Sequence, residues 1–271
     1  MRHLLALLPL LAFQPACAFA AEPVTPVRAL LITGGCCHDY AYQANQLQTG
    51  SKARANVTWT VLHDPRKGTK GQIDLYNDPN WGKAYDVVVH NECFAKTTDA
   101  EYIRKITSVH RKGLPAVVIH CAMHTYRDAK IDDWREFLGV TSRRHEHQAN
   151  YRVVPVAPKH PIMQGFPDTW KTPKDELYVV DKIWPGTTAL ATSRSERNEK
   201  THPVFWVSTY GKARVFGTTF GHGNATWDDT VFIDTVTRGM LWAAGKLGTD
   251  GKPVEGYGPR SSAPASAKAR R

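Results

Sequence analysis

The sequence predicts an α/β fold: a doubly wound, mostly parallel sheet with a β-hairpin late in the chain. Segments 27–33, 84–91 and 115–120 are short apolar runs rich in Val, Ile and Leu, which is typical of strands buried on both faces. Helical patterns lie between them, the clearest over residues 98–112. Alternating strands and helices favour parallel strands joined by right-handed crossovers, with helices covering the sheet.

In the first half of the chain, each element has a local signal. Residues 40–55 form a predicted helix that leads to the strand 57–63, and a loop around residues 68–82 follows. The next helix starts with Thr98-Asp99-Ala100-Glu101, which matches a capping box, and it ends before Gly113. Its apolar residues share one face: Tyr102, Ile103, Ile106 and Val109.

The second half is richer in strands. Residues 151–156, 176–180 and 188–192 have the composition of short strands. Segments 204–208 and 214–219 flank Tyr210-Gly211-Lys212, which is a hairpin signal. The last predicted helix runs from Asp228 to about Lys246, and the acidic pair at its start suits the positive end of a helix.

The N-terminus has the features of a secretory signal peptide. Arg2 precedes an apolar run over residues 4–13 that is too short to anchor in a bilayer, and Ala18-Phe19-Ala20 supplies small residues for cleavage after Ala20. Cys17 raises the alternative of a lipoprotein, but Gln14 stands where a lipobox has an aliphatic residue. No other segment is long and apolar enough to span a membrane, so a secreted or periplasmic protein is expected.

The net charge of +10 does not argue for a nucleic-acid groove in the fold. Residues 1–20 carry a net +1 and residues 246–271 a net +4, so half of the basic excess belongs to the ends. Residues 246–271 combine Gly, Pro, Ser and Ala with basic residues and almost no large apolar side chain, which predicts a disordered basic tail. One domain then spans residues 21–245, and no nucleic-acid partner is expected.

Reactive side chains follow several predicted strands. Ligands of open α/β sheets bind beyond the carboxyl ends of the strands, so residues at those ends are the candidates for chemistry. His, Glu or Cys occurs in four such segments, 34–40, 91–94, 120–124 and 221–228. This convergence predicts a polar site at one edge of the sheet.

The individual motifs leave several alternatives open. Gly34-Gly35 need only make a turn, since neither GxGxxG nor a P-loop is present. The cysteines that remain after signal removal, Cys36, Cys37, Cys93 and Cys121, could form disulfides or be inert core residues, and no CxxC spacing supports a closed zinc site. A mixed site of His38, His120, His222 and a carboxylate would suit zinc or another borderline divalent metal.

Longer segments carry a resemblance to a known family. They are ALLITGG with the following His38, YDVVVHNE, GLPAVVIHCA, HPIMQGFPDTW with DELYVV, and PVFWVSTYGKARVFGTTFGHGNATWDD with RGMLWAAG. In this order, over about residues 27–245, the chain resembles the ThuA-like family, named for a trehalose-utilisation protein. The resemblance implies a flavodoxin-like fold similar to that of class I glutamine amidotransferases, in agreement with the alternating pattern of strands and helices.

The resemblance also implies that amidotransferase chemistry is absent. Those enzymes place a nucleophilic Cys in a Gly-x-Cys-x-Gly elbow at a strand end, paired with a His from a late strand. Here His120 stands where the nucleophile would be, without flanking glycines, and Cys121 is one residue late. His222 falls where the late-strand His belongs. Glutamine hydrolysis by a Cys-His couple is therefore not expected.

The resemblance places polar pocket residues at His38, His120, Glu176 and His222. A carboxylate beside neutral imidazoles can act as a general base or as a metal ligand, which predicts His120, His222 and Glu176 as catalytic residues. The predicted metal ligands are His38, His120 and His222. Predicted substrate-binding residues, among which Trp227 would stack on a sugar face, are His38, Tyr40, Glu92, Tyr178, Trp227 and Asp228.

Cys36 and Cys37 depart from the commoner family pattern of small residues and His after Gly-Gly. Vicinal cysteines near Cys93 and Cys121 suggest a disulfide that ties two strand ends. The expected function is action on a small carbohydrate, by isomerisation or hydrolysis of a disaccharide or keto-sugar. The alternative is a non-catalytic sugar-binding or accessory protein that uses the same cleft. The sequence does not define the oligomeric state.

Overall fold

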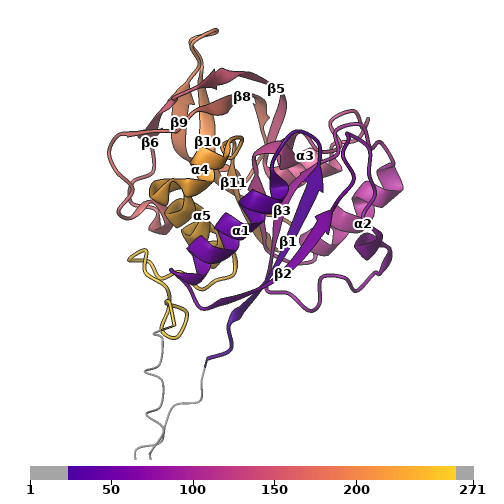
Figure 1. Cartoon of the computed structure of the whole chain (residues 1–271), viewed down its shortest axis with the longest axis horizontal. Helices are drawn as coiled ribbons and strands as arrows, with labels where there is room; N and C mark the ends of the chain where they lie inside the picture. The colour runs from indigo at the N-terminus through magenta and orange to yellow at the C-terminus, as the bar shows by residue number, and fades with distance from the viewer. Residues whose placement is uncertain (1–23, 261–271) are drawn as a thin grey trace, which may run out of the picture.

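The computed structural model describes residues 24–260 (Figure 1). The predicted signal peptide, residues 1–20, lies outside the described residues, as does the segment 261–271. Within the described chain the elements are β1 (Val27–Gly35), α1 (Tyr40–Lys52), β2 (Val57–Asp64), η1 (Asp74–Asn77), β3 (Val87–Cys93), α2 (Ala100–Arg111), β4 (Ala116–Ile119), η2 (His120–Met123), α3 (Asp133–Leu138), β5 (Val140–Ala149), β6 (Arg152–Pro155), η3 (Pro161–Met163), β7 (Trp170–Lys171), β8 (Asp175–Ile183), β9 (Thr188–Arg194), β10 (Thr201–Tyr210), β11 (Ala213–Thr218), α4 (Asn224–Asp228) and α5 (Thr230–Ala243).

The main sheet of the described chain has nine strands in the order β2-β1-β3-β4-β11-β10-β9-β6-β7. The strands from β2 to β11 pair in parallel, as the apolar runs predict. From β11 onward each pair is antiparallel, beginning with the β10–β11 pair in which Tyr210 lies opposite Ala213. The sheet is therefore mixed, because short connections replace the helical crossovers in the second half.

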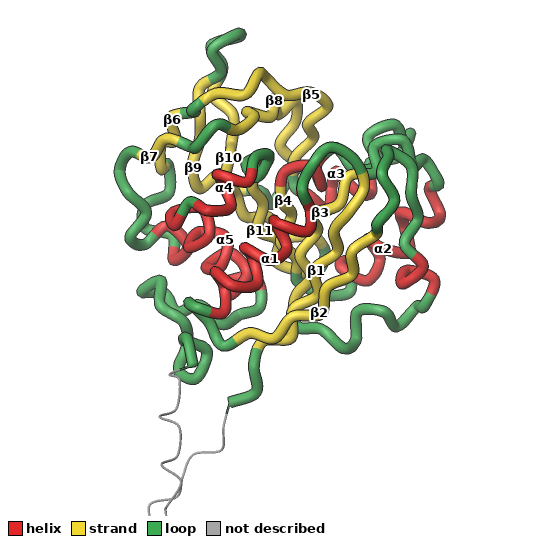
Figure 2. Tube along the Cα trace, viewed as in Figure 1, coloured by secondary structure: helices red, strands yellow, loops and turns green. Residues whose placement is uncertain are grey.

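Helices cover both faces of the sheet and create two cores (Figure 2). α1 and α5 bury one face, where Leu47 and Phe232 pack against alternate residues of β1 and β3 such as Val89. α2 and α3 bury the other face, where Ile103 packs with Val88. Successive strand residues point to opposite faces, so each of these strands contributes to both cores. That explains the continuous apolar runs over residues 29–32 and 87–89.

Two of the elements that the sequence patterns did not indicate are α3 and β5. They follow η2, and β5 pairs with β8 in a separate antiparallel two-stranded sheet beside the main one. β5 is largely polar, and several of its side chains are exposed, so it lacks the apolar signal of a buried strand. The predicted final helix is present as α5, which begins after Asp229 because that side chain caps it by accepting hydrogen bonds from Val231 N and Phe232 N. The short helix α4, which was not predicted, precedes it.

The part of the predicted tail that the structure describes differs from the prediction. Residues 246–260 contain a bridge between Leu247 and Pro253, and Tyr257 packs against the core. Asn56 N also donates to the Tyr257 carbonyl at 3.0 Å. The segment has few apolar residues, but two of them, Leu247 and Tyr257, pack against the core of the domain. Within residues 24–260, no helix has the length and apolar character needed to cross a membrane.

Candidate functional site

Three histidines from distant segments meet at the carboxyl edge of the parallel strands. His38 follows β1, His120 follows β4 and His222 follows β11. One ring nitrogen of each lies within 4.8 Å of the others, and His38 Nε2 is 3.2 Å from His222 Nδ1. The predicted clustering of these histidines is therefore present in the structure.

Hydrogen bonds orient two of these rings with a lone pair toward the centre. His120 Nδ1 donates to the Thr219 carbonyl at 2.7 Å, which leaves Nε2 unprotonated in the neutral ring. Tyr40 donates to the Cys36 carbonyl at 2.8 Å, so its hydroxyl oxygen accepts from His38 Nδ1 at 3.2 Å. His38 Nε2 then also carries a lone pair.

His120 has a left-handed backbone, with φ of 47°. The residue lies where β4 turns sharply into η2, and its side chain is almost completely buried. Left-handed φ is unfavourable for a residue with a Cβ. Such strained residues persist where the surrounding structure holds them in place, and they are concentrated at functional sites. The turn aims the imidazole at the site.

Glu176, at the start of β8, lies among the histidines. Its Oε2 is 3.3 Å from His222 Nδ1, 3.4 Å from His145 Nδ1 and 3.7 Å from His120 Nε2. Burial by itself would raise the pKa of Glu176, but the hydrogen bond and charge of His222 outweigh it and lower the pKa. The same hydrogen bond raises the pKa of His222. These opposite shifts are those of a carboxylate and an imidazole that stabilise each other's charged form.

The two deeper imidazoles stay neutral. Burial lowers the pKa of His38 to about 4, and His222 adds to that effect. Burial also lowers the pKa of His120 well below its ordinary value. Neutral imidazole is the form that binds a metal ion.

The geometry of this cluster fits a divalent metal. Ligands about 2.1 Å from a common ion lie roughly 3.0–3.5 Å apart, the range of the His38–His222 and His222–Glu176 distances. The Thr219 carbonyl behind His120 is the kind of partner that orients metal-binding histidines. Three imidazoles with one carboxylate suit zinc and neighbouring transition metals.

Two cavities adjoin the cluster. An outer one of about 600 Å³ is lined by the loop after β1, by Gln148 and by His222. An inner one of about 200 Å³ is lined by Glu176, His145 and Tyr178. Cys36, Cys37, His38 and His222 line both. The outer volume lies within the range of cavities that hold small organic ligands.

The sequence patterns missed several residues of the site. His145 and Gln148 come from β5, and Gln148 Nε2 is 2.7 Å from His222 Nε2. His124 stacks on Tyr178 with ring centroids 4.0 Å apart. The HEHQ segment of β5 was the available signal, but it belongs to the strand that the patterns did not identify.

Asp175 is a further missed residue, and it anchors the loop that carries His222. Its carboxylate accepts from Gly221 N at 3.0 Å, from His222 N at 3.3 Å and from the Thr226 hydroxyl. Burial raises the pKa of Asp175 to about 6, against the opposing effect of these donors. Asp175 is a positioning residue, and its place directly before Glu176 was the only sequence signal.

The predicted substrate-binding residues divide into two groups. Tyr40 and Tyr178 contact the histidines, the latter with its hydroxyl 3.3 Å from His120 Nε2. The prediction that Trp227 stacks on a sugar is wrong, because its ring is buried and Nε1 donates to the Gly221 carbonyl at 2.9 Å. Asp228 also lies away from the histidines and contacts Tyr42 and Gln46.

Glu92 is not a substrate residue either, because it belongs to a buried network on the α2 face. Glu92 Oε1 is 2.9 Å from His90 Nδ1, and His90 Nε2 is 3.1 Å from His110 Nε2. His110 Nδ1 donates to the Leu114 carbonyl at 2.7 Å, so His110 Nε2 must accept from His90. The contact between His90 and Glu92 then needs one further proton, either on His90 Nδ1 or on the Glu92 carboxyl. In both cases the pair is neutral overall.

We expect Glu92→Gln to leave stability and ligand binding nearly unchanged. The amide that replaces the carboxylate can donate to His90 Nδ1 while His90 Nε2–H donates to His110, so every bond of the network survives. Glu92→Ala should lower the free energy of unfolding by about 3 kcal/mol, because it removes one partner of a fully buried pair. Urea unfolding measures both variants. A well-folded Glu92→Gln protein that no longer binds ligand would restore the original prediction for Glu92.

Comparisons with known proteins agree with this architecture. The model of the ThuA family, described as "Trehalose utilisation", matches residues 28–243. A ThuA-like protein of Parabacteroides merdae superposes with a TM-score of 0.64 at 22% identity, over 86% of this chain and 96% of that one. A ThuA-like protein of Bacteroides uniformis gives 0.62 at 14% identity, over 84% and 96%.

The third similar structure is that of a larger enzyme, of which only one part matches this chain. The β-galactosidase of Bacillus circulans superposes with a TM-score of 0.52 at 9% identity, over 83% of this chain but only 32% of that one. At these identities the likeness concerns the fold alone. No curated protein sequence matches the chain.

Proposed function

Since this chain belongs to the ThuA family and has its amidotransferase-like fold, we propose that it is an exported, metal-dependent enzyme that isomerises or hydrolyses a disaccharide or keto-sugar. One observation carries the proposal: a carboxylate and three imidazole nitrogens converge, and two of these histidines, His38 and His222, line a cavity large enough for a sugar. The family description supplies the carbohydrate, and the export rests on the N-terminal sequence.

His38, His120 and His222 would hold the metal. Their Nε2, Nε2 and Nδ1 atoms face a common centre, and burial keeps the first two rings neutral. A bound divalent cation supplies Lewis acidity toward a sugar oxygen or a bound water. Tyr178, whose hydroxyl faces His120, lines the inner cavity between this centre and His124.

Glu176 would move the proton of the reaction. Glu176 lines the inner cavity and its pKa is lowered, which favours the carboxylate form that can accept a proton from a carbon next to a keto group or from an attacking water. His145 Nδ1, which donates to the Glu146 carbonyl at 2.8 Å and lies 3.4 Å from Glu176 Oε2, is on the exposed side and would stabilise the negative charge of the carboxylate. By the resemblance to amidotransferases, His120 would stand at the turn that carries their nucleophilic Cys, so we propose no Cys–His couple.

Metal content tests the centre. We expect protein purified without chelator to carry about one equivalent of a divalent transition metal, and His120→Ala or His222→Ala to lose it, because each removes one of three imidazole ligands. Elemental analysis with matched isothermal titrations of zinc measures the result. Thr226→Ser, which keeps its hydroxyl behind the loop, serves as a variant of the same region that should retain metal. Wild-type protein that does not bind zinc would refute the metal centre.

Turnover separates the two functions that the site allows. Disaccharides and keto-disaccharides should be converted by the metal-loaded protein and not by the His120→Ala/His222→Ala double variant. Product can be followed by nuclear magnetic resonance of the sugar. If wild-type protein binds a sugar without converting it, and the double variant binds it equally well, the protein is a sugar-binding accessory instead.

A further inference from the structure

Four cysteines gather beside the histidine cluster and form two disulfides. Cys36 and Cys37, in the loop after β1, are joined to each other, and Cys93 is joined to Cys121. The second bond ties the end of β3 to η2, as the expected disulfide between two strand ends would. The cysteine site, as we call these four residues, shares the inner cavity with His38, Glu176 and His222.

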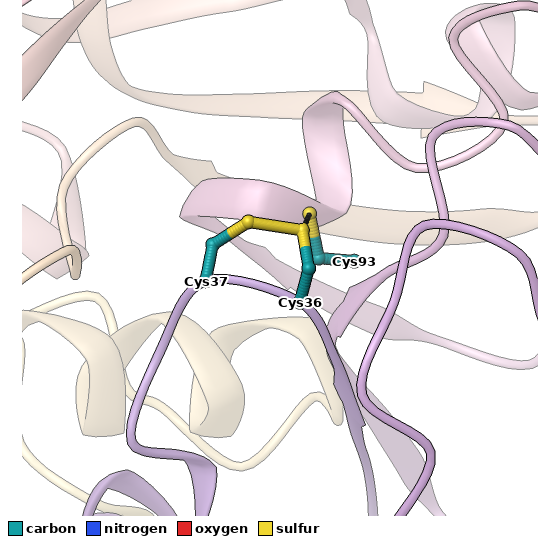
Figure 3. Close-up of side chains that lie close together, drawn as sticks. All are labelled: Cys36, Cys37 and Cys93. Atoms are coloured by element: carbon teal, nitrogen blue, oxygen red, sulfur yellow. Dashed lines mark hydrogen bonds between the residues drawn. A yellow bond between two sulfur atoms is a disulfide. The ribbon is translucent and has the colours of Figure 1, made fainter.

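The two disulfides touch. Figure 3 shows the Cys36–Cys37 bond with the Cys93 sulfur beside that of Cys36, and the two sulfurs are 3.7 Å apart. That separation is close to van der Waals contact, so only a small movement separates it from bond formation. Backbone contact holds the two segments together, because Cys36 N donates to the Cys93 carbonyl at 3.4 Å.

The two disulfides differ in access. Cys37 is exposed and Cys36 partly so, and both line the wide outer cavity. Cys93 and Cys121 are 3% and 6% exposed and line only the inner cavity. Exchange requires an attacking sulfur to approach the disulfide directly, so a bulky reductant can reach the first bond and not the second.

We propose that the cysteine site is a thiol–disulfide exchange relay, in which a protein dithiol reduces Cys36–Cys37 and this pair in turn reduces Cys93–Cys121. The substrate class is a CxxC-type dithiol. This activity is independent of the proposed action on sugars.

The first exchange consumes the external dithiol. One of its thiolates attacks Cys37 Sγ, the Cys36–Cys37 bond breaks, and the electron pair stays on the Cys36 sulfur. The second thiol of the reductant then attacks the mixed disulfide and releases the Cys37 thiolate. The reductant leaves as a disulfide, and the two protons of its thiols balance the two new cysteine thiolates.

The second exchange passes the two electrons inward. The Cys36 thiolate attacks Cys93 Sγ, the Cys93–Cys121 bond breaks, and the electron pair goes to Cys121. The Cys37 thiolate then attacks Cys36 Sγ and releases the Cys93 thiolate. The Cys36–Cys37 disulfide is restored, and Cys93 and Cys121 end as thiols, so the overall change is a two-electron transfer from the external dithiol.

Reduction of the oxidised protein by reduced thioredoxin, as a bulky CxxC probe, tests the relay. Samples are quenched in acid, unfolded, alkylated and mapped by mass spectrometry. In wild-type protein we expect label first on Cys36 and Cys37, then on Cys93 and Cys121. In Cys36→Ser/Cys37→Ser, label on the buried pair should appear at least roughly tenfold more slowly, because the direct route needs local opening.

Two controls keep the result specific. Cys93→Ser/Cys121→Ser should lose its Cys36–Cys37 disulfide at the wild-type rate, because that bond is reached from outside. Dithiothreitol under denaturing conditions should reduce the buried pair of the Cys36→Ser/Cys37→Ser variant fully. In native buffer, the circular dichroism spectrum of this variant should match that of wild type. The proposal is overturned if the buried pair reacts equally fast without Cys36 and Cys37, if it never reacts in wild type, or if all four cysteines are thiols before any reductant is added.

Discussion

Changing Glu176 to Gln is expected to lower turnover of the converted sugar by roughly 10²- to 10⁴-fold, the usual effect of losing a positioned general base. The amide has the shape of the carboxylate and can still hydrogen-bond near His222, but it cannot take a proton. The rate constant kcat should carry most of the loss, since the cavity walls are unchanged. Steady-state kinetics on metal-loaded protein measure it.

Asp228→Asn is the matched control, because it makes the same change of carboxylate to amide at the neighbouring helix α4. Asp228 contacts Tyr42 and Gln46 rather than the histidines, so turnover should stay within about twofold. The free energy of unfolding should change by less than about 0.5 kcal/mol, as is usual for a surface substitution. A Glu176→Gln protein with normal kcat would show that Glu176 is not the base. Equal losses in both variants would point to a general effect of charge.

Replacing Asp175 by Ala is expected to lower the free energy of unfolding by about 3–5 kcal/mol, because three buried donors lose their acceptor at once. Those donors are Gly221 N, His222 N and the Thr226 hydroxyl. For a domain of this size, the midpoint of thermal unfolding should fall by roughly 10 °C. Differential scanning calorimetry measures that fall, and zinc titration measures the accompanying loss of metal affinity as the His222 loop is released.

Asp175→Asn gives the graded comparison. The amide keeps one acceptor oxygen, so Asp175→Asn should lose about half as much stability as Asp175→Ala. The remaining loss comes from its NH₂ group, which faces other donors. If Asp175→Ala weakens zinc binding without lowering the unfolding midpoint, Asp175 acts on the site directly rather than through the loop. An Asp175→Ala variant as stable as wild type would contradict the anchoring role.

The sequence predicted the fold best where the strands are buried on both faces. Runs such as 87–89 and 116–119 are apolar because helices cover each side of the sheet, and periodicity alone identifies them. β5 could not be found in this way, because its HEHQ segment lies beside a cavity and carries polar side chains for the site. The requirement that makes β5 useful also hides its strand signal.

The candidate site was predictable to the extent that it depends on strand ends. His38, His120 and His222 meet because parallel strands end at one edge, which a pattern of strands can anticipate. Side-chain direction was the part that could not be anticipated. Glu92 points to the α2 core through strand alternation, and Trp227 turns inward from α4, so two residues near the edge in sequence do not face the cavity.

Asn56, just before β2, bonds to both ends of the described chain. Its amide donates to the Val24 carbonyl at 3.3 Å and to the Gly256 carbonyl at 3.0 Å, and Arg260 Nε donates to its Oδ1 at 2.7 Å. Parallel strands begin at this edge and end at the histidines, so both ends emerge at the pole opposite the cavity (Figure 1). An attachment to a carrier or electrode at either end of the described chain would therefore leave the mouth of the cavity open to solvent.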